Sequence, residues 1–190
     1  MGKELNITVF TISHKFKETI EDSQEIYSLN IQPFDVLLAT HKLPYKILKR
    51  LSNRDQTWSV GPSDWDAIKL KINKNVAICG FSIFSTTQES MKSTLTYKLK
   101  VNNNLLREEK TEIYFSPNRM IKVEFDVSKI VRLVSGDVLS MMHSIVDDQC
   151  KTYSGNLGVK ECEYFKIESC SDGNNGTDTE CGQFPEIYYL

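Results

Sequence analysis

Three histidines and five cysteines are the residues of this 190-residue chain whose side chains most often bind metals or act as nucleophiles. The cysteines form no C-x-x-C pair, and the histidines do not lie at ligand spacing from them or from each other. These residues are Cys79, Cys150, Cys162, Cys170, Cys181, His14, His41 and His143. The sequence therefore predicts neither a zinc site nor a full disulfide framework, but free thiols in a reducing compartment.

Adjacent carboxylates are the next candidates, because two of them could serve as acid and base or hold calcium. Glu108 precedes Glu109, and Asp147 precedes Asp148. Neighbouring residues of a strand point to opposite faces, so such pairs converge only in loops, and solvated turn residues are the simpler interpretation. His143 could be a general base, although a core-edge histidine bonded to backbone is the simpler interpretation. Since no nucleotide-binding or hydrolase motif is present, we expect no enzyme, no cofactor and no metal site.

Strands would position any such side chains, because apolar and polar residues alternate through most of residues 66–190. The segments STLTYKLKV and RMIKVEFDV each place one apolar row and one polar row on opposite faces. The run VAICGFSIF is apolar almost throughout, and Gly80 within it predicts a bulge or a close backbone approach. Short strands separated by turn-rich pieces predict an all-β, antiparallel and jelly-roll-like β-sandwich.

The first 52 residues differ from the rest and predict an α/β N-terminal extension. The segments LNITVFTIS and EIYSLNI predict two strands. After Pro33, the chain FDVLLATHKLPYKILKRLSNRD predicts one or two short helices, with Asp35 as a possible cap and Pro44 in a first turn. We therefore divide the chain into an extension, residues 1–52, and a β-sandwich, residues 53–190.

The charge of the chain limits its partners. A net charge of −2 provides no general basic field for a phosphate backbone, so we expect no nucleic acid. No apolar run could span a bilayer and no secretory signal is present, so we expect no membrane and a cytoplasmic location. One locally basic segment contains Lys42, Lys46, Lys49 and Arg50. It is either a solvated helix face or an electrostatic contact to a partner.

Two blocks at the ends of the sandwich resemble one known family. The first is DQTWSVGPSDWDAIKLKINKNVAICGFSIF and the second is SCSDGNNGTDTECGQFPEIYYL. Together they resemble the opening and the close of a PHR domain, the module of Pam/Highwire-type ubiquitin ligases and of BTB-BACK-PHR substrate adaptors. Ser82 and Ser85 depart from the glycines that are usual around the apolar strand. The resemblance covers residues 53–190 and implies a sandwich of about ten or eleven strands.

The residues that carry this resemblance are expected to be structural before they are functional. They fix a glycine-dependent turn and dock the last strand, so Gly176 and Gly182 are expected to have positive φ. They are Gly80, Asn175, Gly176, Thr177, Gly182, Gln183, Pro185 and Glu186.

The resemblance implies a non-catalytic protein-binding module that recognises a partner or substrate in a ubiquitin-ligase-type system. Without a RING-type Cys/His array, the chain could bind but not ubiquitinate. Two alternatives stay open. One is a structural component of a large cytoskeletal assembly, with the basic segment as its handle, which would make the location cytoskeleton-associated. The other is a jelly-roll lectin or small-ligand-binding domain.

Binding to a protein partner is expected through loops at one end of the sandwich, where aromatic side chains offer large contact area. The candidates are Trp58, Trp65, Asn118, Arg119 and Tyr153. The two tryptophans could instead be plugs that close the sandwich end. The polar strand face with Lys98 and Lys100 is expected to be flat and without an anchor.

Overall fold

The computed structural model describes residues 11–13, 19–20, 38–40, 45–87, 90–117, 120–146 and 150–190, with backbone only for 11–13, 19–20, 38–40 and 53–56. The chain forms two compact units, Met1–Pro44 and Tyr45–Leu190. In the first unit, β1 (Thr11–Ser13) pairs antiparallel with β2 (Thr19–Ile20) and with β3 (Leu38–Thr40). The second unit begins earlier in the chain than the boundary drawn from the sequence at residue 53.

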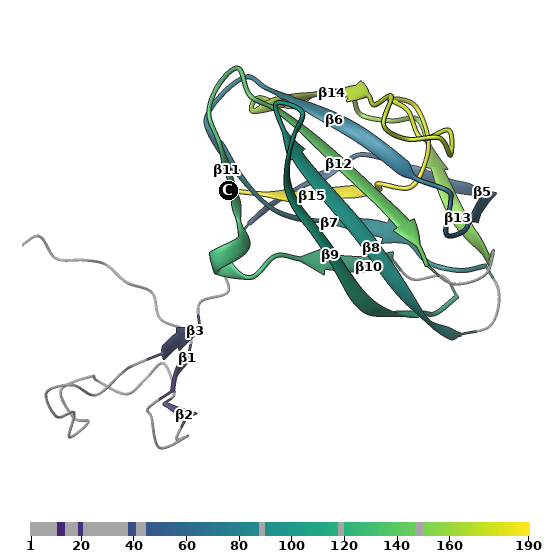
Figure 1. The fold of residues 1–190 in the computed structure, drawn as a ribbon, viewed down its shortest axis with the longest axis horizontal. Helices are drawn as coiled ribbons and strands as arrows, with labels where there is room; N and C mark the ends of the chain where they lie inside the picture. The colour runs from purple at the N-terminus through teal and green to yellow at the C-terminus, as the bar shows by residue number, and fades with distance from the viewer. Residues whose placement is uncertain are drawn as a thin grey trace, which may run out of the picture. The chain divides into compact units, whose positions relative to one another are not determined.

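Two antiparallel sheets make up most of the second unit (Figure 1). The β8 sheet has the order β14 (Phe165–Ser169), β6 (Asp66–Ile72), β12 (Val138–Ile145), β8 (Met91–Val101) and β9 (Asn104–Phe115). The β7 sheet has the order β10 (Met120–Glu124), β7 (Val76–Phe84), β15 (Glu186–Tyr189) and β4 (Lys46–Lys49), and β11 (Val131–Leu133) also pairs with β7. A small sheet joins β5 (Asn53–Val60) to β13 (Cys150–Asn156).

One hydrophobic core lies between the β8 sheet and the β7 sheet. Leu95 and Leu99 of β8 are fully buried, as are Ile78 and Phe81 of β7, and all four belong to the same cluster. The alternation of β8 therefore buries the row that the sequence predicts, and β7 is buried along almost its whole length. These observations confirm an all-β antiparallel sandwich, with twelve strands in the described part of Tyr45–Leu190.

The short helices expected after Pro33 are wrong within the described residues. Leu38–Thr40 and Lys46–Lys49 are strands, and β4 pairs antiparallel with β15, with Ile47 opposite Tyr188. The free edge of the last strand supplies hydrogen bonds that override a weak local helix preference. Asp35 and Pro44 lie outside the described residues, as do His14, His41, Lys42, Asp147 and Asp148.

The described part of the chain contains a single 3-10 turn as its helical element, η2 (Val127–Lys129), between β10 and β11. Over the same residues, no helix has the length and apolar character needed to cross a membrane. All five cysteines are free thiols, with Cys79, Cys150 and Cys170 buried.

Gly80 lies where β10 and β15 both pair with β7. Its Cα is opposite Glu124 on one side and Tyr188 on the other, and the pairing with β15 shifts register beside it. A Cβ at this position would lie 2.2 Å from the carbonyl oxygen of Val123. The sequence-based expectation of a bulge or close backbone approach is therefore confirmed, and β10 can approach β7 this closely only because residue 80 has no side chain.

We expect Gly80→Ala to lower the free energy of unfolding by about 2–3 kcal/mol, because β10 must move away from β7. Gly136→Ala is the matched control, since Gly136 has φ +97 and no atom within 4 Å of an added Cβ. The control suffers backbone strain alone, about 1 kcal/mol. Urea denaturation of both variants measures the difference, and equal losses would contradict the close-approach argument.

Candidate functional site

The loop between β14 and β15, residues 170–185, is called the C-terminal loop, and the buried carboxylate of Asp66 anchors its middle. Asp66 is 1% exposed. Its Oδ1 accepts a hydrogen bond of 2.5 Å from the Thr177 hydroxyl, and its Oδ2 accepts one of 2.9 Å from Asn175 Nδ2. Burial raises the pKa of Asp66 to about 6, although the hydrogen bonds from Thr177 and Asn175 act in the opposite direction. The carboxylate thus depends on the C-terminal loop for its hydrogen bonds.

A buried guanidinium holds the far end of the C-terminal loop. Arg50 is fully buried, and its Nη1 donates to the carbonyl oxygen of Phe184 at 3.2 Å. Its Nη2 donates to the carbonyl oxygens of Asp178 and Cys181. Burial lowers the pKa of Arg50 to about 10, so it stays charged at neutral pH. Arg50 therefore cannot belong to a basic surface handle, which corrects that part of the sequence interpretation.

Gln183 and two glycines of the second sequence block add to this anchoring. Gln183 donates its backbone N–H to Thr177 Oγ1 at 3.1 Å and its Nε2 to Thr152 Oγ1 at 3.0 Å. Gly176 and Gly182 have φ of 84° and 121°, which confirms the expected positive φ. A Cβ on Gly182 would lie 2.1 Å from Thr177 Oγ1. Direct contacts thus tie these residues to the fold.

Pro185 and Glu186, also in the second sequence block, join the C-terminal loop to the edge of the β7 sheet. The carbonyl oxygen of Pro185 accepts the backbone N–H of Arg50 at 2.7 Å. The Glu186 side chain is buried and accepts the Tyr188 hydroxyl at 2.9 Å. The loop and the last strand are therefore connected through backbone and side chains alike.

Three of the five expected partner-binding residues, Trp58, Trp65 and Tyr153, lie in the described part of the chain. Trp58 and Tyr153 lie in β5 and β13, where Trp58 pairs with Thr152 and Tyr153 pairs with Thr57. Cross-strand partners share a face and neighbouring residues alternate, so Trp58 and Tyr153 point to opposite faces of the small sheet. Trp58 packs against the main core and lies beside Gly176. Asn118 and Arg119 lie outside the described residues, and a binding role for the five stays a prediction.

Trp65 lies on the outer face of the β8 sheet. It packs against a small cluster of Ala67, Met142 and Cys170, and the ammonium of Lys98 lies 4.5 Å from the centre of its ring. Lys98 also pairs with Glu108 at 3.4 Å. The polar strand face with Lys98 was expected to lack an anchor for a partner, but it carries a half-buried tryptophan.

His143 is a core residue. It is 1% exposed, its ring stacks on Phe81 and packs edge-on against Phe184, and burial lowers its pKa to about 3. Neither ring nitrogen has a hydrogen-bond partner among the described residues, so the expected bond to backbone is not found. A neutral imidazole enclosed in this way cannot reach a substrate as a general base.

The adjacent acids Glu108 and Glu109 point to opposite faces of β9, since Glu108 pairs with Lys98 and Glu109 accepts the Tyr97 hydroxyl. They therefore do not converge. The described part of the chain holds no group of three or more side chains suited to a metal ion.

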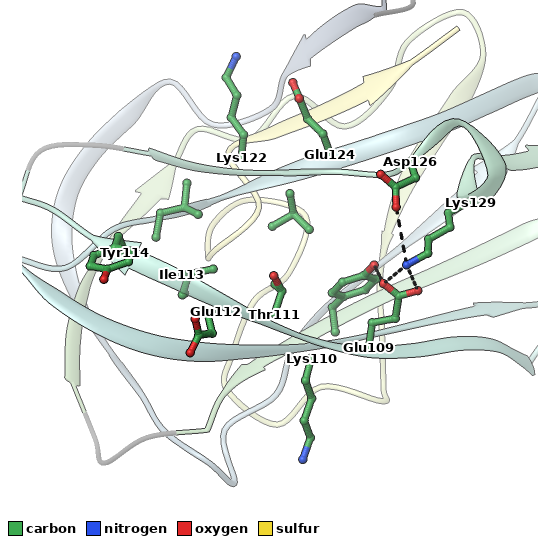
Figure 2. Close-up of a pocket in the computed structure, with 13 residues that line it drawn as sticks. Glu109, Lys110, Thr111, Glu112, Ile113, Tyr114, Lys122, Glu124, Asp126 and Lys129 are labelled. Carbon is green, nitrogen blue, oxygen red and sulfur yellow. Dashed lines mark hydrogen bonds and ion pairs between the residues drawn. The ribbon is translucent and has the colours of Figure 1, made fainter. Parts of the chain in front are cut away.

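A cleft of about 480 Å³ lies between the edge strands β9 and β10 (Figure 2). Its walls come from β9 on one side and β10 on the other, and Tyr97 of β8 contributes to its lining. Ile113 and Val123 are buried in the main core and also line the cleft. The cleft is therefore an open side of the sandwich, at which the core meets the surface.

An ion cluster connects η2 to β9 at one end of the cleft. Lys129 Nζ lies 2.9 Å from Glu109 Oε1, and Arg107 Nη1 donates to the carbonyl oxygen of Lys129 at 2.7 Å. The Tyr97 hydroxyl donates to Glu109 Oε2 at 2.7 Å. The hydrogen bond from Lys129, followed by that from Tyr97, holds the pKa of Glu109 below its ordinary value. Glu109 is therefore ionised at neutral pH, which keeps the cluster intact.

The comparisons with known proteins agree with this architecture. The family model described as the PHR domain matches residues 49–190. No curated protein matches the chain at a significant level. The fold is an all-β sandwich with an anchored C-terminal loop, and the chain belongs to the PHR domain family.

We expect the stability of the protein to depend on pH through Asp66. The pKa of Asp66 is about 6 in the folded protein and 3.8 ordinarily, so between these values the folded state holds a proton that the unfolded chain has released. This favours folding at low pH, and the effect is lost as the pH rises through 6. The free energy of unfolding, relative to that of Asp66→Asn, should fall by about 2–3 kcal/mol between about pH 4 and pH 7.

Urea denaturation of both proteins across this range measures the difference. The Asp66→Asn variant loses one hydrogen bond at every pH, which changes its free energy of unfolding by a constant amount. The titration of Asp66 instead makes the difference in free energy between the two proteins change with pH. A difference that is constant with pH, or that grows as the pH rises, would contradict the raised pKa.

Proposed function

We propose that this chain is a non-catalytic, cytoplasmic protein-binding module that recognises a partner or substrate in a ubiquitin-ligase-type system. The match of residues 49–190 to the PHR domain carries this proposal, because that domain is a protein-interaction module at the level of the family. The burial of His143 and the divergence of Glu108 and Glu109 also favour binding over catalysis.

The cleft between β9 and β10 is the partner-binding surface that the geometry supports best. Tyr97, Ile113 and Val123 lie at its floor but are almost fully buried, so charged and polar side chains make up most of its accessible lining. A polar, solvent-accessible rim is a feature of protein interfaces. The C-terminal loop, in contrast, uses its polar groups internally, on Asp66 and Arg50.

Affinity purification of the tagged full chain from its native cells, after cross-linking, tests the proposal. We expect a ubiquitin-ligase component to co-purify and then to bind the purified chain directly in solution. Co-purification of filament proteins alone would instead support the cytoskeletal alternative. Binding of the chain to glycans but to no protein would support the lectin alternative, and either result would contradict the proposal.

Once a partner is known, alanine substitutions test two of the aromatic candidates, Trp65 and Tyr153, separately. We expect Trp65→Ala or Tyr153→Ala to weaken binding by more than about 1 kcal/mol if these residues touch the partner. Lys71→Ala, at an exposed position of β6, is the control, because Lys98 of β8 contacts the Trp65 ring. Both aromatic variants binding like the parent protein would contradict a role for Trp65 and Tyr153, while the cleft would remain the candidate surface.

A further inference from the structure

We infer that Leu157 and Val159 insert into an apolar pocket of the protein partner. They belong to the loop between β13 and β14 (Figure 1), whose residues 157–159 are called the tip. None of these residues lines the cleft, so the tip is a contact surface of its own. This inference rests on the proposed protein-binding function and specifies the chemistry of the partner, which is a pocket lined by aliphatic or aromatic side chains.

Leu157 has a backbone conformation that leucine rarely adopts. In the described part of the chain, three residues other than glycine have positive φ, and two of them are Asn102 and Asn103. Asparagine tolerates this conformation because its short side chain can hydrogen-bond to the nearby backbone. Leu157 has a φ of 57°, at which its Cβ crowds the following carbonyl oxygen. Glycine or asparagine would therefore fit the backbone at residue 157 better than leucine does.

The side chains of the tip are also exposed to water. Leu157 is 66% exposed and Val159 is 42% exposed. Neither belongs to the two hydrophobic clusters found among the described residues. A single exposed leucine is common on protein surfaces, but this one combines exposure with backbone strain. Strained residues cluster at binding sites, where they are part of the binding mechanism, so we assign the side chain of Leu157 to a contact with another molecule.

The C-terminal loop holds one side of the tip. Gly158 donates its backbone N–H to the carbonyl oxygen of Glu180 at 3.0 Å. A Cβ at residue 158 would collide with the carbonyl oxygen of Thr179, so this close contact requires glycine. The middle residue of the tip is therefore fixed against the far end of the C-terminal loop.

Arg50 and Ser52 hold the other side of the tip. The carbonyl oxygen of Arg50 accepts the backbone N–H of Val159 at 2.7 Å. The carbonyl oxygen of Asn156, just before the tip, accepts the backbone N–H of Ser52 at 3.2 Å. Because the guanidinium of Arg50 also donates to the carbonyl oxygen of Phe184, Arg50 fixes the tip and the C-terminal loop to each other. A tip held in this way presents its side chains in one arrangement, which lowers the entropic penalty of binding.

The charged groups beside the tip bind one another. Lys160, the residue after the tip, forms an ion pair with Glu180. Asp178 Oδ1 accepts the backbone N–H groups of Glu180 and Cys181 at 2.7 and 2.9 Å. An anionic membrane or a nucleic acid would require unpaired lysine or arginine side chains beside the exposed leucine. An apolar anchor with charged neighbours that are already paired instead matches a protein interface, in which a polar rim surrounds the anchor.

The melting temperature of Leu157→Asn tests whether the leucine contributes to the fold. Asparagine tolerates positive φ and removes an exposed aliphatic group. The variant should therefore melt no lower than the parent chain and up to about 4 °C higher. A melting temperature below that of the parent chain, beyond the error of the measurement, would mean that Leu157 stabilises the fold and would overturn the inference.

The contact itself is tested with the ubiquitin-ligase component that co-purifies with the parent chain. Calorimetry with that purified component should show at least about tenfold weaker binding for Leu157→Asn. Leu157→Met keeps an apolar side chain and should bind within about threefold of the parent chain. Val134→Asn is the matched control, because Val134 is 59% exposed between β11 and β12 and should leave binding unchanged when substituted.

Three results of this calorimetry would overturn the inference. The first is equal binding by Leu157→Asn and the parent chain. The second is an equal loss in Leu157→Asn and Val134→Asn. The third is a loss in Leu157→Met as large as that in Leu157→Asn.

Photo-cross-linking identifies the kind of surface that the tip contacts. A p-benzoylphenylalanine placed at residue 157 of the full-length chain should cross-link to apolar side chains of one pocket in the same purified component. Cross-links to a flat, charged surface, or no cross-links, would overturn the inference. Co-sedimentation of the parent chain with vesicles of phosphatidylcholine and phosphatidylserine, abolished in Leu157→Asn, would also overturn it, since the tip would then bind lipid.

The outcome can be separated from that of the proposed function. A ubiquitin-ligase component that binds the parent chain and Leu157→Asn equally would leave the proposed function intact and overturn the tip as its anchor. The absence of any protein partner would contradict the proposed function itself, and the inference with it, whatever the melting temperature of Leu157→Asn.

Discussion

The hydrogen bonds between the buried carboxylate of Asp66 and the C-terminal loop are the interaction on which the rest of the sandwich depends. A carboxylate at 1% exposure is unfavourable unless donors surround it, and Thr177 and Asn175 provide two. Both donors belong to the C-terminal loop, 111 and 109 residues away in the chain. Burial of Asp66 at the start of β6 therefore requires the loop to be in place, and the loop in turn carries β15 into the centre of the β7 sheet.

Arg50 holds the other end of the C-terminal loop. Its guanidinium supplies donors to the carbonyl oxygens of Phe184 and Cys181, and buried carbonyl oxygens destabilise a fold when donors are lacking. Its position directly after β4 explains why Lys46–Lys49 is a strand, since the backbone N–H of Arg50 already bonds to Pro185, just before β15. With β4 and β7 on its two sides, β15 has no free edge. The unpaired edges that remain beside the cleft are those of β9 and β10.

The sequence could predict whatever depends on local alternation or on the special conformation of glycine. The buried row of β8, the close approach at Gly80 and the positive φ of Gly176 and Gly182 all follow from short segments. It could not predict β4, because that strand is defined by pairing with residues more than a hundred positions away. The hydrogen bonds of Asp66 are equally distant, so the residue gave no signal beyond its place in a recognisable block.

The sequence did not predict the cleft, for a related reason, although one signal for it is present in β9. In the segment REEKTEIYF of β9, the row that faces inward begins with Arg107, Glu109 and Thr111 and becomes apolar only at Ile113. A strand that keeps its pairing but loses its apolar row must extend beyond the core. The polar half of that row therefore marks where β9 leaves the core and a wall of the cleft begins. The ion cluster at Glu109, with Lys129 on one side and the Tyr97 hydroxyl on the other, holds this wall in place where the apolar row no longer does.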